Sequence, residues 1–125
     1  MNALGRHLLL ELKNCNLEVL NDLDYLRDCL HDAAEQIGAT VVNDAFYRFS
    51  PHGISGVVII SESHLCIHTW PEHDYAAIDI FTCGDSVEPE RAVKLLVEKL
   101  GSRAPSFIEL KRGTLQSNRV SCELK

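Results

Sequence analysis

The centre of the chain, residues 56–82, reads GVVIISESHLCIHTWPEHDYAAIDIFT. It contains three apolar segments, each about the length of a β-strand, separated by short polar turns. Residues 56–61 and 65–70 form the first two segments, Pro71 ends the second, and residues 75–82 form the third. Successive strands joined by short turns pair antiparallel, so we expect an antiparallel sheet in this part of the chain.

The segment before this centre predicts a helix. Apolar residues recur every three or four positions from Leu17 to Ile37, which is the spacing of an amphipathic helix. Asn14 or Asn16 is the expected N-cap, and Gly38 stands where the helix would end.

A second helix and several strands complete the expected elements. Residues 89–100 predict a helix with a proline in its first turn and a glycine after its end. Further strands are expected at residues 6–12, 40–42, 45–49 and 107–110, and a polar tail at residues 113–125. This order predicts a single domain, 1–125, of the α+β class: a two-layer sandwich, mainly antiparallel sheet with two helices packed on one face.

Composition narrows the class of protein. Of 125 residues, 46% are hydrophobic and 24% are charged, as in ordinary globular domains, and the net charge of −6 argues against a nucleic-acid partner. The five cysteines are scattered, without a CxxC pair, and the first residues have no apolar signal segment. No segment has the roughly 20 apolar residues of a membrane span. We expect a cytoplasmic protein with reduced thiols and no membrane partner.

Polar side chains are dense between Ser55 and Cys83, within segments predicted to be core strands. Buried polar groups need partners, and such local violations often mark a function. His64, Cys66 and His68 alternate, so a regular strand places their side chains on one face. With Cys83 they are candidates for a zinc site, although this alternation is not the usual spacing of structural zinc ligands.

Two other interpretations of these residues stay open. Cys83 with His68 is a candidate pair for acid–base or nucleophilic chemistry. Alternatively, His64 and Cys66 are half-exposed residues of an edge strand without a chemical role, since free cysteines often behave as small hydrophobic residues.

As a whole, the sequence resembles the small bacterial and archaeal class of S-adenosylmethionine decarboxylases. The resemblance runs from about Gly5 to Leu100 and is most specific in the run Glu62-Ser63-His64. The other matching segments are residues 5–7, 38–40, 55–58, 60–65, 67–72, 75–79 and 81–84, together with Phe49 and Gly53.

The resemblance implies that the chain is made as a proenzyme and cleaves itself. The cleaved bond is Glu62–Ser63, which divides the chain into residues 1–62 and 63–125. The hydroxyl of Ser63 attacks the carbonyl carbon of Glu62, and an elimination then converts Ser63 into a pyruvoyl cofactor; no metal is implied.

Two residues are implied as helpers of this cleavage. Ser55 would hydrogen-bond the intermediate of the acyl shift, and His68 would remove the α-proton of Ser63. Positions 63 and 68 have opposite parity, so a regular strand directs their side chains to opposite faces.

The resemblance also implies the residues of the decarboxylation. The pyruvoyl carbonyl forms a Schiff base with the substrate and acts as an electron sink, and Cys83 returns a proton to the former Cα. Phe49 is expected to stack on adenine and Trp70 to supply a second aromatic surface, unless both pack in the core; Glu72 is expected to accept hydrogen bonds from the ribose. Family members are homodimers of processed protomers, with active sites between the protomers.

The expected function is therefore conversion of S-adenosylmethionine to its decarboxylated form, the aminopropyl donor for spermidine. His52, Cys66 and Asp74 replace the Tyr, Thr and Gly that are typical at these positions. The additional carboxylate of Asp74, otherwise a turn residue, keeps open a basic amino acid, arginine or ornithine, as the substrate. A non-enzymatic metal-binding module is the alternative from another class. For Arg6 and His7 we expect a structural ion pair or strand-end contact.

Overall fold

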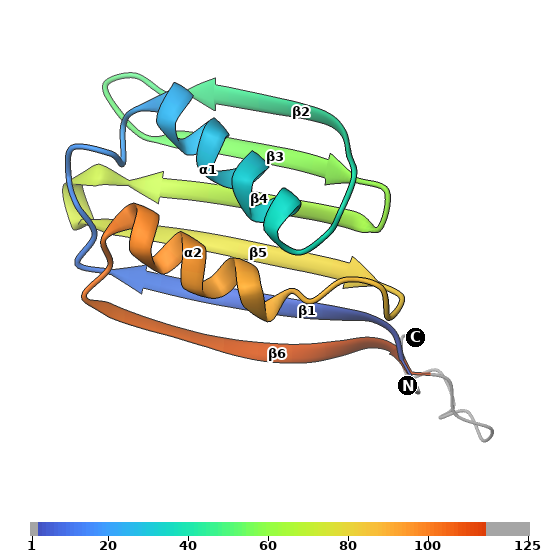
Figure 1. The fold of residues 1–125 in the computed structure, drawn as a ribbon. Helices are drawn as coiled ribbons and strands as arrows, with labels where there is room; N and C mark the ends of the chain where they lie inside the picture. Colours follow the sequence, from blue (N-terminus) through green and yellow to red (C-terminus); the bar gives the residue numbers. More distant parts are fainter. Residues whose placement is uncertain (1–2, 115–125) are drawn as a thin grey trace, which may run out of the picture.

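The structure, a computed structural model, describes residues 3–114 (Figure 1). Within these residues the chain forms six strands and two α-helices, with a short 3-10 helix between β4 and β5. Their bounds are β1 Ala3–Lys13, α1 Leu23–Gln36, β2 Val41–Arg48, β3 Ile54–Ile60, β4 Ser63–Trp70, η1 Pro71–His73, β5 Tyr75–Cys83, α2 Glu90–Leu100 and β6 Ala104–Thr114.

The strands form one sheet in the order β2-β3-β4-β5-β1-β6, and each neighbouring pair is antiparallel. Strands β2 to β5 follow one another as neighbours, whereas β1 lies between β5 and β6. Strand β4 is therefore central, paired on both sides. The interpretation of His64 and Cys66 as edge-strand residues is wrong, because β3 and β5 both hydrogen-bond to the strand that carries them.

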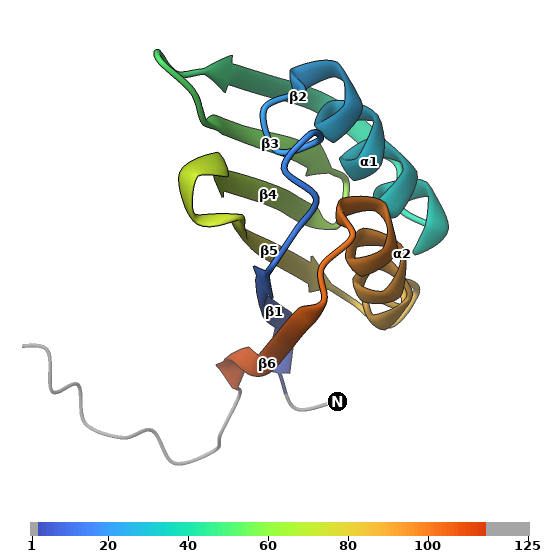
Figure 2. The same cartoon turned by 90° about the vertical axis from the view of Figure 1, so that its left-hand side faces the viewer.

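Both helices cover the same face of the sheet, and the other face is open (Figure 2). Side chains alternate along each strand, so every second residue enters the core between the sheet and the helices. The largest fully buried side chains are Leu8, Leu10, Leu12, Leu20, Leu26, Leu30, Ile54, Leu65, Ile67, Ile78, Ile80 and Leu96. The predicted α+β two-layer sandwich with two helices on one face is confirmed.

Helix α1 begins at Leu23, later than Leu17, where the apolar spacing begins. Asp22 is its N-cap, because the Asp22 carboxylate accepts a hydrogen bond of 3.0 Å from the backbone N–H of Tyr25. The end agrees with the prediction: Gly38 follows the helix and has a positive φ of 85°.

The chain between β1 and α1 forms turns. The side chain of Asn16 accepts a hydrogen bond of 3.0 Å from the backbone N–H of Glu18, so it stabilises a turn and does not cap the helix. The predicted N-cap at Asn14 or Asn16 is therefore wrong. Leu20 is fully buried although it lies in this turn, which explains why the helical spacing of apolar residues continues outside the helix.

The other elements differ from the predicted ones mainly at their ends. The segments predicted at residues 40–42 and 45–49 belong to one strand, β2. Strand β6 extends the predicted strand 107–110 in both directions. The tail predicted at residues 113–125 lies, after its first two residues, outside the described part of the chain. Among the described helices, none is long and apolar enough to cross a membrane.

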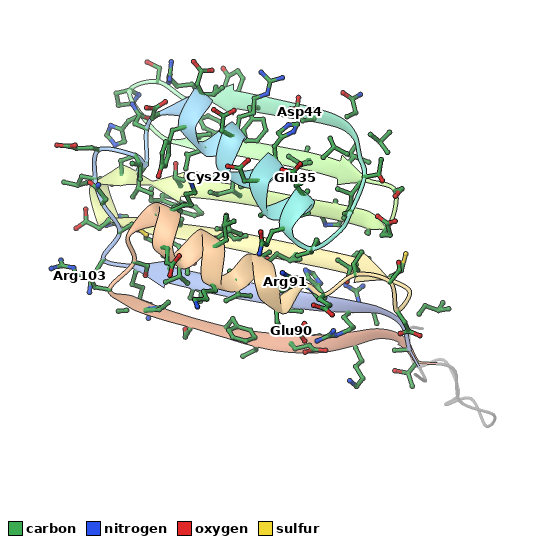
Figure 3. All side chains as sticks on the ribbon, viewed as in Figure 1. Cys29, Glu35, Asp44, Glu90, Arg91 and Arg103 are labelled. Atoms are coloured by element: carbon green, nitrogen blue, oxygen red, sulfur yellow. The ribbon has the colours of Figure 1, made fainter. Side chains whose placement is uncertain are left out.

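Arg6 connects three elements of the fold. Its Nε donates to Glu109 on β6 at 2.7 Å, and its Nη2 contacts Glu90, which begins α2 (Figure 3). The hydrogen bonds from Arg6 lower the pKa of both carboxyl groups. The structural ion pair expected for Arg6 is confirmed.

Candidate active site

The Glu62–Ser63 bond lies in the tight turn between β3 and β4. Ile60 pairs with Ser63, so only Ser61 and Glu62 connect the two strands. Ser63 has a φ of 138°, in the range that favours glycine; a non-glycine residue held there costs about 1–3 kcal/mol. The bond singled out by the sequence therefore precedes a strained residue.

The carbonyl oxygen of Glu62 accepts hydrogen bonds from two donors of Cys83. The backbone N–H of Cys83 lies at 2.9 Å and its Sγ at 3.2 Å. Two donors on one carbonyl oxygen stabilise negative charge that develops there. The sequence pointed to Cys83 but not to this contact, because the contact depends on β5 pairing beside β4.

The hydroxyl of Ser63 lies beside the next residue, His64. The distance from Ser63 Oγ to His64 Nδ1 is 3.4 Å. Burial, and after it the charge of His7, lowers the pKa of His64, so this imidazole is neutral at neutral pH. The sequence predicted His64 only as a zinc-ligand candidate or as a half-exposed strand residue. Its contact with Ser63 was not predicted, because side chains that follow each other on a regular strand point to opposite faces.

Ser55 and His68 lie at the other end of β3 and β4. They are direct partners in the strand register, and Ser55 Oγ is 2.7 Å from His68 Nδ1. A cavity of about 300 Å³ lies beside them and is also lined by Phe49, Trp70 and Glu72. These five residues, all expected site residues, thus share one region.

Phe49 and Trp70 are exposed aromatic surfaces, at 47% and 40% exposure, and are not part of the core. Trp70 stacks on Tyr75 with 5.3 Å between ring centroids, and Phe49 meets Tyr47 edge-on at 4.9 Å. The alternative that both pack in the core is wrong, because Phe49 follows the end of edge strand β2 and Trp70 points to the open face.

The carboxylates of Glu72 and Asp74 belong to the turn between β4 and β5. Glu72 Oε1 lies 3.0 Å from Nε2 of His52. Asp74 has a left-handed backbone with φ 53°, and its carbonyl accepts a hydrogen bond of 2.9 Å from Cys15. A left-handed position accounts for the glycine expected here, and aspartate tolerates it better than most residues.

The expected site residues form two clusters: the Glu62–Ser63 bond with Cys83 is the first, and Ser55 with His68 is the second. These two clusters do not meet within one chain. His68 follows Ser63 by five residues on β4, and a strand rises about 3.3 Å per residue, so their Cα atoms are about 16 Å apart. Ser55 lies opposite His68, at the same end. The side chains of Ser55 and His68 are therefore too distant to act on the Glu62–Ser63 bond of their own chain.

The zinc alternative finds no support in residues 3–114, where no group of three or more His, Cys, Asp or Glu side chains is placed to hold a metal ion. His64 and His68 share a face, but they are four positions apart on the strand, which separates their Cα atoms by about 13 Å. Cys66 Sγ donates to Asp79 at 3.7 Å, and burial raises the pKa of the Cys66 thiol to about 11.

A larger cavity, of about 520 Å³, lies between the two helices. It is lined by Tyr25 of α1 and by Arg91, Lys94 and Lys99 of α2 (Arg91 is labelled in Figure 3). It lies on the helix side of the molecule, and none of the expected site residues lines it. The expected site residues therefore lie elsewhere in the molecule.

The fold and site define a class, that of two-layer α+β proteins in which a Glu-Ser bond precedes a strained serine and lies beside a cysteine. Residues 6–113 match the family model of S-adenosylmethionine decarboxylase. The chain therefore belongs to the S-adenosylmethionine decarboxylase family.

Individual relatives agree with this assignment. The S-adenosylmethionine decarboxylase proenzyme of Thermodesulfovibrio yellowstonii is 52% identical over 115 residues, which cover 92% of this chain and 85% of that protein. The corresponding proenzyme of Oceanobacillus iheyensis is 54% identical over 113 residues, 90% of each chain. The crystal structure of the adenosylmethionine decarboxylase of Aquifex aeolicus superposes with a TM-score of 0.86 at 30% identity, covering 97% of this chain and 100% of that one.

Proposed function

We propose that this chain is a proenzyme that cleaves itself between Glu62 and Ser63 and then decarboxylates S-adenosylmethionine. The observation that carries the proposal is the carbonyl oxygen of Glu62, which accepts hydrogen bonds from the N–H and the thiol of Cys83. Such an oxygen is prepared for the negative charge that it acquires when a hydroxyl attacks the carbonyl carbon. Cleavage also releases the strained backbone of Ser63.

Cleavage produces chains 1–62 and 63–125 and a cofactor from Ser63. Attack by Ser63 Oγ exchanges the amide for an ester, and loss of the α-proton then expels the Glu62 carboxylate and leaves dehydroalanine. Water converts dehydroalanine to a pyruvoyl group with release of ammonia.

The residues at the start of β4 fit this group. These residues would hold a pyruvoyl group at position 63, which, joined to the substrate's amino nitrogen, would supply the electron sink that loss of carbon dioxide requires. The thiol of Cys83 already contacts the Glu62–Ser63 junction, so it lies close enough to donate a proton to the former Cα.

The open face of the sheet supports association of two chains. Ile59, Ile108 and Leu110 point to this face and are 44%, 60% and 46% exposed. They lie on β3 and on β6, so exposed apolar side chains occur towards both edges of this face, and such exposure is typical of an interaction surface. We therefore propose a homodimer in which the open faces of two protomers pack on each other.

In the proposed homodimer, twofold symmetry brings the first cluster of one protomer next to the second cluster of the other protomer. The pair Ser63 and Cys83 lies at one end of the β3–β4 hairpin, and Ser55 with His68 lies at the other. A twofold axis between these ends places each cluster over the opposite cluster of the second protomer. His68 then removes the α-proton of the partner's Ser63, and Ser55 donates to the oxygen of the acyl-shift intermediate.

Phe49, Trp70 and Glu72 are proposed to hold the substrate. The exposed faces of Phe49 and Trp70 attract a sulfonium cation and stack on adenine. The carboxylate of Glu72 accepts hydrogen bonds from ribose hydroxyls. Arginine or ornithine has no ring to stack on these faces, and the relatives are named for S-adenosylmethionine, so this alternative is not favoured.

The product, decarboxylated S-adenosylmethionine, serves as the aminopropyl donor for spermidine. We place the reaction in the cytoplasm, where reduced cysteines persist. Within residues 3–114, Cys15, Cys29, Cys66 and Cys83 are free.

Intact-mass measurement under denaturing conditions tests the first half of this proposal. We expect two chains, with the 63–125 chain lighter than one that begins with serine by the mass of ammonia. Ser63→Ala is the control and stays whole. A wild-type chain that remains intact on long incubation would contradict self-cleavage.

A product assay tests the second half. The cleaved protein is incubated with S-adenosylmethionine, arginine or ornithine, and carbon dioxide and the amine product are measured. We expect release with S-adenosylmethionine alone. Release with arginine or ornithine and none with S-adenosylmethionine would overturn the substrate assignment while leaving the cofactor assignment in place.

A further inference from the structure

We propose that His64 is the base that accepts the proton of the Ser63 hydroxyl when this hydroxyl attacks the Glu62 carbonyl. The inference rests on the proposed self-cleavage and adds the group that activates the nucleophile. A serine hydroxyl is a weak nucleophile until a neighbouring group takes its proton. His68, implied as the base of the later elimination, lies about 16 Å from Ser63 in the same chain.

The geometry places His64 at the reacting oxygen. Its Nδ1 lies 3.4 Å from Ser63 Oγ, within the same chain and before any second protomer is needed. Catalytic hydrogen bonds are often long in a resting protein and shorten in the reacting state. With the Cys83 donors on the Glu62 oxygen, one turn holds a nucleophile, its base and an oxyanion site.

The imidazole of His64 is held in place by its neighbours. Its ring meets Phe81 edge-on, with 5.6 Å between centroids and 68° between planes. Phe81 is itself fixed by His7, at 5.3 Å between centroids, and by the guanidinium of Arg112, 5.5 Å above its ring. Because these contacts come from β5, β1 and β6, the sheet positions the His64 ring beside Ser63.

The surroundings keep His64 in its basic form. The groups around it are Ile59 on β3, Cys66 on β4, Asp79 on β5, His7 on β1 and Arg112 on β6. Burial and the charge of His7 lower the pKa of His64, and Asp79 opposes them. The net effect is a lowered pKa of His64. At neutral pH its imidazole is therefore neutral, and one ring nitrogen is free to accept a proton.

The proton returns within the same step. The Oγ–C bond to Glu62 forms while the Oγ proton passes to Nδ1 of His64. The C–N bond between Glu62 and Ser63 then breaks, and the imidazolium gives its proton to the departing nitrogen of Ser63. Amide becomes ester with no net gain or loss of protons, and His64 ends as it began.

The test follows cleavage of freshly synthesised chain by mass against time. His64→Ala and the closer replacement His64→Gln are compared with wild type and with His73→Ala, an exposed histidine on η1. We expect both His64 variants to cleave about 100-fold more slowly or worse, the usual contribution of a general base. The His73 control should cleave at the wild-type rate.

Treatment with hydroxylamine distinguishes a role of His64 in the acyl shift from a role in the later elimination. Hydroxylamine cuts the ester that the acyl shift forms and leaves amides intact. A chain blocked before the acyl shift holds no ester, so His64→Ala should stay whole in hydroxylamine. His68→Ala, blocked at the elimination, should be cut at residue 62. Cutting of His64→Ala at that position would overturn the inference, because its defect would then lie after the acyl shift.

The pH profile of the wild-type chain needs no variant. Protonation of His64 removes the base, so the cleavage rate of the wild-type chain should fall at a pH below 6.5, the ordinary histidine pKa. The slow residual cleavage of His64→Gln should not show this fall, because the variant has no imidazole at this position. Wild-type rates for both His64 variants would refute this inference alone. Failure of the wild-type chain to cleave would refute the proposed function with it.

Discussion

Cys83 has two contacts with the carbonyl oxygen of Glu62, one through its backbone N–H and one through its thiol. Only the thiol contact depends on the residue type. The thiol is also the proposed proton donor of the decarboxylation, so substitutions at this one residue affect two reactions to different degrees.

We predict that Cys83→Ala slows self-cleavage by about tenfold, because an S–H is a weak donor and the backbone N–H remains. Release of carbon dioxide as the decarboxylated product should fall by at least about 100-fold, since the acid is lost. Time courses of chain mass and of product formation measure the two effects. Cys83→Ser, which keeps a donor at this position, is the matched control for cleavage; an unchanged cleavage rate in Cys83→Ala would contradict the role of the thiol contact.

At the scale of the elements, the start of α1 shows how local spacing misleads. Leu20 continues the apolar spacing of the helix but is buried from a turn. The helix begins where Asp22 accepts a hydrogen bond from the backbone N–H of Tyr25. A capping contact depends on the backbone conformation of one residue, which hydrophobic periodicity does not report.

Asp22→Ala should lower the free energy of unfolding by about 1 kcal/mol through loss of this cap. Urea unfolding of the uncleaved Ser63→Ala chain measures the change without interference from processing. Asp28→Ala, an exposed aspartate within the same helix, serves as the control and should change stability less. Equal effects of the two substitutions would argue against the capping role of Asp22.

Arg6 provides a pH-dependent connection between β1, β6 and α2. The pKa values of Glu90 and Glu109 are lowered in the folded chain, so the unfolded chain binds protons more readily than the folded one. This stabilisation is present above the ordinary carboxyl pKa of 4.5 and is lost as pH falls through the lower folded values.

We therefore expect Arg6→Met to lower the free energy of unfolding by about 1–2 kcal/mol at pH 7. The difference from the parent chain should shrink below pH 4.5, as the two carboxyl groups of the parent take up protons. Urea unfolding at several pH values in the Ser63→Ala background measures both. A difference that stays constant down to pH 3 would show that Arg6 acts through packing and not through its charge.

At the scale of the whole molecule, the proposed homodimer rests on the distance between the two clusters. Ser63 and His68 are about 16 Å apart along β4. In the proposed homodimer, each protomer therefore contributes one cluster to each active site.

Mixing two inactive variants tests this arrangement. Ser63→Ala has no nucleophile and His68→Ala has no elimination base, so neither chain should form a pyruvoyl group alone. When the two are co-expressed with different tags, the His68→Ala chain should be processed, because its Ser63 meets an intact His68 in the partner. No processing in purified mixed dimers would contradict an active site shared between protomers.

Much of this molecule could be predicted from local patterns. Alternation and helical spacing predicted the strands, the two helices and the two-layer arrangement, because each pattern reports which side of an element is buried. The cleavage position has another origin: it is implied by the resemblance of the run Glu62-Ser63-His64 to the decarboxylase family, and it stays a prediction.

The contacts between site residues could not be predicted in this way, because they depend on the pairing of segments that are distant in the sequence. The pairing of β5 with β4 places the two donors of Cys83 on the Glu62 carbonyl, and the turn after Ile60 brings the hydroxyl of Ser63 to His64. The straight course of β4 keeps His68 away from Ser63. Strand register and direction depend on which segments pair across the whole sheet, and no run of neighbouring residues contains that information.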